Sequence, residues 1–431
     1  MLKQDKAERM GSTVRHENGD PNMSSLIDQE KVINGFTRAE WDRRHRKIRE
    51  MLQLRNIDCL VVVGCSAKNW AYATNQMYVM GEGTTGLGDY TYAVFPMEGE
   101  PVQLQGVPTG TGKIWVGPNL TIPTVLDPIF KKGKGEGQRI KDYAWGIVQI
   151  VKERGLEKGT IGIADMRVMP AEVYLEVVRE LPQAMFVPAG DVLLEIRRIK
   201  SPEEQEYIRK AALAADKGAE AMIEEASRPG ATMGGIQMAC RVGMLKAGAQ
   251  RVDFVSVRVA SWEEMINSSY LSRDPSRNVM KGDLILNEIN PMFNGLEAQA
   301  CYPISVGTAE KDMPDSLKKT LKLHKEMYEF VRGELRPGKT VLDIEREAAK
   351  IAASHGMTGK VWTLQTSEMV EDHYKLNYTE IKPGMAYVNH PSVSPAPGEK
   401  GHRGIIMGNT LIITEGEPEV TSRRSVGITV V

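Results

Sequence analysis

The segment GDLILNEINPMFNGLEAQACYPISVG, residues 282–307, constrains the fold of this chain more than any other segment. Its two mainly apolar runs, 283–293 and 296–306, predict two buried strands joined by a turn. Two polar residues interrupt this hairpin: Glu288 and, eleven residues later, Gln299. Because a lone carboxylate is costly to bury without a partner, the pair indicates either a structural hydrogen bond or a functional pocket.

The composition is that of a soluble globular protein. The chain has 431 residues, 41% of them hydrophobic and 26% charged, which is enough for two or three domains with a sizeable core. Lys and Arg number 55 against 56 Asp and Glu. This balance argues against nucleic acid as an obligate partner, because phosphate binding requires a basic excess or a strong basic patch.

Cysteine usage and the N-terminal residues bear on location. Cys59, Cys65, Cys240 and Cys301 form no CxxC pair, which predicts neither a disulfide framework nor a zinc site. Residues 1–36 are polar and lack the apolar core of a signal peptide, and no run of apolar residues is long enough to span a membrane. We therefore expect a cytoplasmic protein without membrane contact.

The chain divides into a short arm and two domains. We predict an N-terminal arm over 1–36, an α/β domain over 37–195 and an α+β domain over 196–431. In the first domain, valine-rich and isoleucine-rich strands alternate with helical patterns, which predicts helices packed over a mixed sheet. The predicted strands cover 58–64, 91–96, 100–106 and 160–165, and the predicted helices cover 37–55, 138–155 and 170–181.

The second domain opens with a strong helix start. Ser201 is a capping hydroxyl, Pro202 occupies the first helical position and Glu204 completes a capping box. Long helices and antiparallel strands follow, which is an α+β pattern. The predicted helices cover 201–226, 232–247, 315–334 and 340–354, and the predicted strands cover 252–261, 283–293, 296–306, 385–393 and 409–414.

These features occur in an order that resembles one known family. The segments NWAYATN (69–75), EIRRIKSPEEQEYIRKAA (195–212), GDLILNEI, GLEAQACYPISVG, KPGMAYVNHP (382–391) and NTLIITEGEPEVTS (409–422) carry the resemblance. In this order and spacing they resemble the creatinase/prolidase family, which includes aminopeptidase P. The resemblance covers about residues 37–425 and implies a C-terminal catalytic domain with the pita-bread fold.

The resemblance also implies a departure in chemistry. Metal-dependent members hold two ions with two aspartates, one histidine and two glutamates. The matching positions in this chain are Glu288, Gln299, Thr366, His390 and a position at or beside Gly408. Since a pair of hard divalent ions needs bridging anionic oxygens, we expect no two-metal site and no cofactor. The alternative is one divalent ion held weakly by Glu288 and His390.

The matching positions also provide candidate catalytic groups. We expect Glu288 and His390 to act as acid and base, since imidazole can take and give a proton near neutral pH. His373 matches a family histidine that lies near the scissile bond. The alternatives are a hydrogen-bonded core residue for His390 and a surface histidine for His373. The creatinase-type catalytic histidine is absent, because Tyr270 or Leu271 stands at its position.

Further residues are candidates for substrate binding. Gln299 could orient an amide or carboxylate, and Thr366 occupies a ligand position. Trp262, Trp362 and Tyr302 either line a pocket or pack in the core. Among the loop arginines near the predicted pocket mouth, Arg273, Arg277 and Arg403, one could clamp a carboxylate. Cys301 shares strand parity with Gln299 and is either a nucleophile or a small buried residue.

Together these features predict an enzyme. The favoured function is a metal-independent, creatinase-type hydrolase that cleaves a C–N bond in a small molecule, or a lyase acting on a C–C or C–X bond. The first alternative is an Xaa-Pro aminopeptidase-like metallohydrolase with altered ligands. The second is a non-catalytic binding module of the same fold. The resemblance also implies a homodimer.

Overall fold

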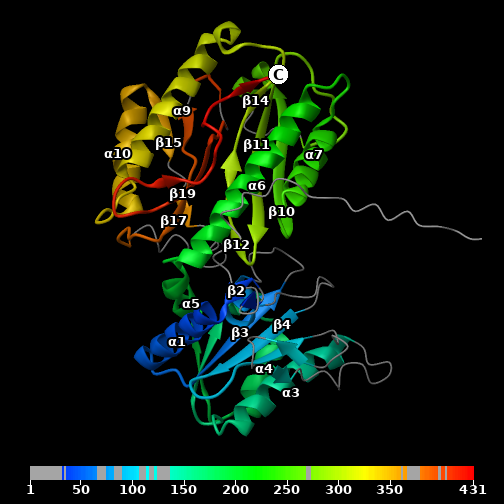
Figure 1. The fold of residues 1–431 in the computed structure, drawn as a ribbon, viewed down its shortest axis with the longest axis vertical. Helices are drawn as coiled ribbons and strands as arrows, with labels where there is room; N and C mark the ends of the chain where they lie inside the picture. Colours follow the sequence, from blue (N-terminus) through cyan, green and yellow to red (C-terminus); the bar gives the residue numbers. More distant parts are fainter. Residues whose placement is uncertain are drawn as a thin grey trace, which may run out of the picture.

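The computed structural model describes most of the chain. The described residues are 32–33, 35–65, 74–81, 90–105, 113–115, 121–123, 136–267, 273–360, 363–365, 379–396, 399–402 and 405–431. They form two sheets, each covered by its own helices, with the smaller sheet at the bottom of Figure 1 and the larger at the top. Short two-stranded sheets join β1 (Val32–Ile33) to β2 (Phe36–Thr37) and β6 (Lys113–Trp115) to β7 (Thr121–Pro123).

The N-terminal sheet is five-stranded and mixed, with the order β5-β4-β3-β8-β9. Strand β3 pairs antiparallel with β4 and parallel with β8, as the predicted α/β pattern requires. The strands are β3 (Cys59–Cys65), β4 (Tyr90–Pro96), β5 (Val102–Gln105), β8 (Thr160–Ala164) and β9 (Met185–Pro188). The helices of this part are α1 (Arg38–Leu54), α2 (Thr74–Met80), α3 (Glu136–Glu153), α4 (Ala171–Glu180) and α5 (Gly190–Arg197).

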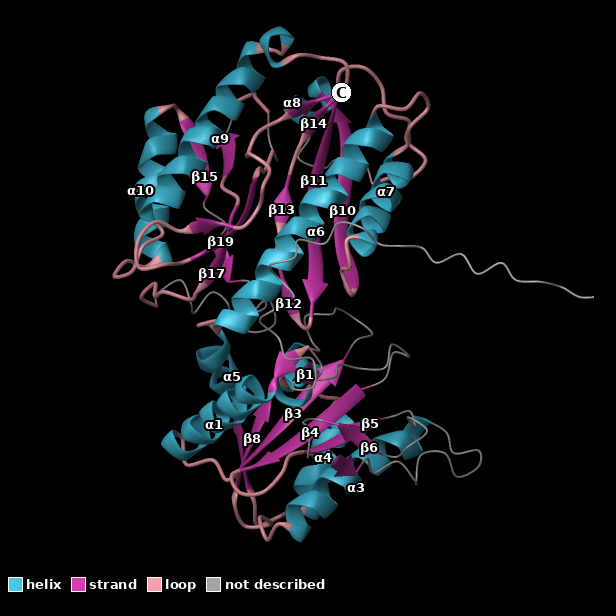
Figure 2. Ribbon diagram, viewed as in Figure 1, coloured by secondary structure: helices cyan, strands magenta, loops and turns pink. Residues whose placement is uncertain are grey.

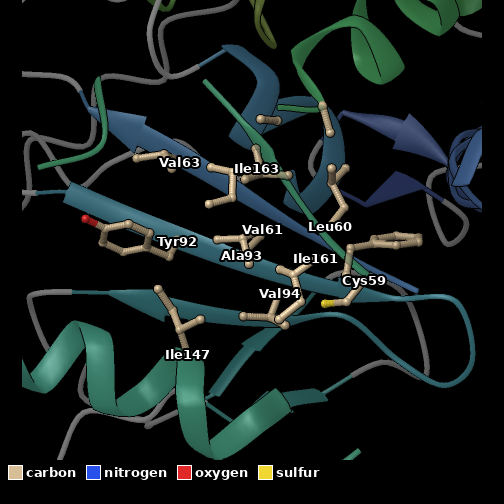
Figure 3. Close-up of a cluster of buried hydrophobic side chains, with 14 of the residues drawn as sticks. Cys59, Leu60, Val61, Val63, Tyr92, Ala93, Val94, Ile147, Ile161 and Ile163 are labelled. Atoms are coloured by element: carbon tan, nitrogen blue, oxygen red, sulfur yellow. The ribbon is translucent and has the colours of Figure 1, made fainter. Parts of the chain in front are cut away.

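The core of this part is mainly aliphatic. Val61, Val94 and Ile161 from three neighbouring strands lie together, and Ile147 from α3 packs over them (Figure 3). All seven residues of β3 are buried, which explains why its sequence is an unbroken apolar run. Because successive side chains of β3 point to opposite faces and all are buried, both faces of this sheet are covered.

Buried charges join α1 to the C-terminal part. The Arg44 guanidinium donates to Glu40 at 2.8 Å and to Glu204 at 2.9 Å. Its Cζ atom lies over the Phe36 ring, 3.8 Å from the ring centroid. Glu204 is the capping-box residue of α6 (Pro202–Ala226), whose N-cap is Ser201 as predicted. The helix start that the sequence indicates thus also anchors α1.

The C-terminal sheet has ten strands and carries the segment of residues 282–307. Its main path is β16-β17-β19-β13-β11-β14-β21, with β10 and β12 beside β11 and β20 beside β19. The strands are β10 (Arg251–Ser261), β11 (Asp283–Phe293), β12 (Leu296–Glu297), β13 (Ala300–Cys301), β14 (Ile304–Ser305), β16 (Thr363–Gln365), β17 (Ala386–Asn389), β19 (Gly408–Ile412), β20 (Glu419–Val420) and β21 (Thr429–Val430). A separate pair joins β15 (Met357–Lys360) to β18 (Ser392–Pro395).

Helices cover one face of this sheet. Figure 2 shows α6 and α7 (Met233–Lys246) along β10 and β11, and α9 (Asp315–Glu334) and α10 (Val341–Ser354) along β15, β17 and β19. Under α6 and α7 lie Ile285, Ile289 and Ala300. Under α9 and α10 lie Tyr387 and Leu411. A short helix, α8 (Trp262–Asn267), follows β10.

The predicted strand 296–306 is broken into β12, β13 and β14, because side chains replace parts of the backbone ladder. The Asn287 amide donates to the Tyr302 carbonyl at 2.6 Å and accepts from its N–H at 2.9 Å. The Thr410 hydroxyl likewise accepts from the Gln299 N–H at 2.9 Å. Pro303 has no N–H to contribute. The ladder is thus interrupted beside the polar residues of the hairpin.

Membrane insertion finds no support in the described helices. None of them is both long and apolar enough to cross a bilayer.

Candidate functional site

Three predicted site residues lie together on the sheet face opposite α6 and α7. The side-chain amide nitrogen of Gln299 donates to Oε1 of Glu288 and lies 3.5 Å from Nε2 of His390. They come from β11, the β12–β13 connection and the residue after β17. Gln299 is 1% exposed and His390 is 5% exposed, so this contact is shielded from solvent.

Strand register explains the gathering. Glu288 pairs with Ser256 of β10, one residue before Ile289 pairs with Ala300 of β13. Since side chains alternate across a sheet, Glu288 faces away from α6 while Ile289 faces it. The β17–β19 register, in which Asn389 pairs with Asn409, brings the following residue, His390, to the same side as Glu288.

Burial raises the proton affinity of Glu288. Burial raises the pKa of this carboxyl above its ordinary value, while the nearby Arg258 charge and the Gln299 hydrogen bond lower it less strongly. A raised pKa makes the ionised carboxylate a stronger base than an exposed glutamate. Glu288 is therefore suited to take a proton from water.

His390 is held neutral. Burial lowers the pKa of its imidazole to about 4, so the ring carries no charge at neutral pH. Because the Gln299 amide can only donate from its nitrogen, Nε2 of His390 is the accepting nitrogen and Nδ1 carries the proton. Nδ1 is buried and has no hydrogen-bond partner among the described residues. A neutral ring with a free N–H can donate to a substrate oxygen.

Position 390 also ends a strand. Pro391 lacks an N–H, and the predicted strand 385–393 is divided there into β17 and β18, which join different sheets. The bend leaves His390 at the edge of the ladder rather than within it.

Arg258 on β10 is a site residue that the sequence predictions omit. It pairs with Leu286 and lies on the same face as Glu288, two residues along β10 from Ser256. It is half-buried and close enough to lower the pKa of Glu288, but it forms no ion pair within the described part of the chain. The alternation of Val255, Val257 and Val259 with Ser256 and Arg258 is the sequence signal for this polar face.

Tyr302 lies away from these residues. Its hydroxyl donates to Asp216 of α6 at 2.8 Å, and its ring packs under α6 and α7. The placement on the helix-covered face does not support the predicted substrate-binding role. Cys301 does face the side of Glu288, but it is completely buried, and burial raises the pKa of its thiol well above the ordinary value. This favours a small packing residue over a nucleophile.

Trp262 lies near one end of the same face. It packs against a cluster that includes Ala260, Leu284 and Leu286, and its indole N–H is buried without a partner among the described residues. The remaining predicted site residues, Thr366, His373, Trp362 and Arg403, lie outside the described residues.

The family of the chain follows from comparison with known proteins. Residues 206–415 match the metallopeptidase family M24. Creatinase from Bacillus sp. is 22% identical over 405 residues, covering 90% of this chain and 92% of that protein. Ectoine hydrolase from Halomonas elongata is 31% identical over 182 residues, covering 41% of this chain and 42% of that protein. The M24 match and these relatives support the assignment of the chain to the creatinase/prolidase family.

Solved structures confirm the predicted fold class. A dipeptidase from Pyrococcus horikoshii superposes with a TM-score of 0.68 at 18% identity, covering 90% of this chain and all of that one. An X-Pro aminopeptidase from Thermotoga maritima gives 0.69 at 15% identity, covering 90% of this chain and 99% of that one. The chain therefore has an N-terminal α/β domain and a C-terminal pita-bread domain. Its sequence relatives are hydrolases, in agreement with the predicted enzyme class.

The family description raises the question of a two-metal centre, and the described donor positions do not fit one. The Gln299 amide is neutral and presents an N–H to Glu288, where a bridging carboxylate is needed. Gly408 has no side chain, and a Cβ built there would lie 1.8 Å from the carbonyl oxygen of Asn389. Within the described residues, no three His, Cys, Asp or Glu side chains form a metal-binding group.

Proposed function

We propose that this chain is a hydrolase that cleaves a C–N bond in a small molecule bearing a carboxylate. The contact of Gln299 with both Glu288 and His390 is the observation that carries this proposal. It joins a carboxylate of raised pKa to a neutral imidazole on one sheet face. The hydrolase activities named for creatinase and ectoine hydrolase support the reaction class.

Each residue has a role in the proposed reaction. Glu288 takes a proton from water as the oxygen attacks the carbon of the C–N bond, and then gives that proton to the leaving nitrogen. His390 donates from Nδ1 to the oxygen or nitrogen that gains negative charge on that carbon. Gln299 holds the side chains of Glu288 and His390 in position through its amide nitrogen. All three act in a buried environment, where hydrogen bonds to developing charge are strong.

Arg258 indicates the substrate class. A half-buried guanidinium without a carboxylate partner in the described part of the chain is suited to bind an anionic group on the ligand. Its position on the face of Glu288 supports binding of that group near the bond to be cleaved. We therefore propose amides, ureas and amidines with a nearby carboxylate as substrates.

Activity of site variants tests the proposal. The full-length protein is screened against carboxylate-bearing amides, ureas and amidines and against their methyl esters, with amine release as the signal. Glu288→Gln and His390→Ala should each lower kcat/KM by about 10²–10⁴-fold. Glu345→Gln, at a half-buried glutamate on α10, is the matched control and should keep full activity. Turnover that survives both site substitutions would refute the assignment.

A metallohydrolase with altered ligands is the second candidate, and the family description favours it. It requires bound transition metal in the purified protein, so elemental analysis separates the two. A non-catalytic binding module would give no turnover on the panel, although Arg258 would still bind carboxylates.

We also propose a cytoplasmic homodimer that binds neither nucleic acid nor membrane. The four cysteines are free and buried, and the formal net charge is −1, which support a reducing compartment and the absence of a nucleic-acid partner. Light scattering of the purified protein tests the dimer: a mass near 48 kDa would contradict it.

A further inference from the structure

A pocket lies on the other side of the C-terminal sheet from Glu288. It has a volume of about 770 Å³ and is lined by residues of α6, by Ala247 just after α7, by Phe293 and by residues between 423 and 429. This last segment leads into β21, which pairs with β14 at the C-terminus marked in Figure 1. The volume is within the usual range of small-molecule sites.

Hydrogen bonds fix the floor of this pocket. The Asp216 carboxylate accepts from the Tyr302 hydroxyl at 2.8 Å, the Ser422 hydroxyl at 2.7 Å and the Arg423 N–H at 2.7 Å. These three donors satisfy acceptor sites of the carboxylate. Glu220 at the rim is paired with Lys217 at 2.7 Å. The two acidic groups of the pocket are therefore already engaged.

The two arginines of the pocket are not engaged by carboxylates. Arg423 is exposed and Arg424 is half-buried, and neither forms an ion pair within the described residues. The Arg424 guanidinium lies 5.5 Å from the Tyr302 ring centroid, and its Nε is buried without a hydrogen-bond partner in the same part of the chain. Lys210 of α6 adds another cation to the lining, beside Lys217, which is paired with Glu220.

The lining also contains apolar residues, among them Leu213, Ala214 and Phe293. A ligand here would meet both cationic and apolar side chains. We propose that this pocket binds a small organic anion, with a carboxylate or phosphate group on Arg423 and Arg424 and an apolar body against Leu213 and Phe293. This site is separate from the proposed active site and does not depend on it.

Calorimetric titration tests the site with two anions, benzoate and phenyl phosphate, and benzyl alcohol as the neutral counterpart. The full-length Arg258→Gln protein is used beside the wild type, so that an anion bound near Glu288 is not counted. Both proteins should bind at least one of the anions saturably and the alcohol not at all. Comparison of the two anions tells a carboxylate ligand from a phosphate ligand.

Variants locate the binding. Arg423→Gln with Arg424→Gln should weaken anion binding about tenfold or more, because two charge-assisted contacts are lost. Arg346→Gln on the exposed face of α10 is the control and should bind like the wild type. Leu213→Trp keeps both arginines but fills the apolar side, and it should also weaken binding. A thermal melt of each variant checks that it is folded.

Three results would overturn the proposal. They are no saturable anion binding in the wild type, equal affinity in the double arginine variant, and loss of binding in Glu288→Gln. These three binding measurements remain valid if the proposed hydrolase activity is not found, because none of them requires turnover.

Discussion

The two faces of the C-terminal sheet are built from the same strands and differ in what they carry: one carries a continuous apolar core, and the other carries the cluster of Glu288, Gln299 and His390. On the face under α6 and α7, Ile285, Ile289 and Ala300 pack in a continuous core. The polar Tyr302 and Asp216 on that side are hydrogen-bonded to each other. On the other face, His390 has a buried nitrogen without a partner in the described part of the chain.

This difference separates stability from chemistry. A residue on the helix-covered face contributes to stability through burial, so its truncation should leave catalysis unchanged. Polar residues buried on the face of Glu288 lower the stability of the fold. A protein retains such residues where they bind a ligand. Substitutions on alternate positions of a single strand can test this division.

Gly408→Ala should have the largest effect. The added Cβ would collide with backbone atoms of Asn389 and His390, which cannot move without shifting β17. We expect a loss of about 4 kcal/mol in the free energy of unfolding, measured by urea denaturation. Gly333→Ala in α9 is the control, since its Cβ meets open space, and it should be neutral or slightly stabilising. A stable Gly408→Ala protein would show that the site can accept a ligand side chain.

Acidification should have the next largest effect, through His390. Its pKa is about 4 in the folded protein and about 6.5 when unfolded, so below pH 6.5 the unfolded state binds more protons. The free energy of unfolding should therefore fall by about 3 kcal/mol through this group as the pH drops from 6.5 to about 4. His390→Gln should lack this loss. The two proteins are compared at pH 8 first, and parallel curves below that pH would contradict a buried neutral ring.

Ile289→Val should have a smaller effect and only on stability. Removal of one methylene under α6 should cost about 1 kcal/mol in unfolding free energy. Its neighbour Glu288 is on the opposite face, so kcat/KM should stay within twofold of the wild type, about the error of comparison. A large kcat/KM change in this variant would mean that the two faces are not independent.

Arg258→Gln should have the smallest effect on stability, below about 0.5 kcal/mol, because the side chain has no ion partner in the described residues. Its charge lowers the pKa of Glu288, so its removal should raise that pKa further. If Glu288 is the base, the acid side of the kcat profile moves to higher pH. The KM for carboxylate substrates should rise, while their methyl esters should be unaffected. An unmoved profile would contradict a catalytic Glu288.

Much of the fold could be predicted because helix signals are local. The capping box at Ser201 and the apolar spacing of α9 are readable within a few residues, and both match the structure. The break in 296–306 was not readable, because it depends on Asn287 and Thr410 from other strands. Local sequence does not state which side chains will replace a backbone ladder.

The candidate site was predictable in part. The family resemblance identified the positions of Glu288, Gln299 and His390, which lie together in the fold. Because side chains alternate along a strand, Tyr302 points to the opposite face from Gln299 and Cys301. This alternation alone would have excluded Tyr302 from the candidate site. Arg258 was missed because valines surround it and it lies in no motif of the resemblance.

Metal content of the purified full-length protein is the most direct test of the claim that this site works through Glu288 and His390 rather than through two bridged ions. Elemental analysis is combined with turnover before and after treatment with a chelator. We predict less than about one transition-metal ion per chain and no change in kcat on chelation. About two ions per chain, with turnover lost on chelation and restored by the metal, would contradict the account.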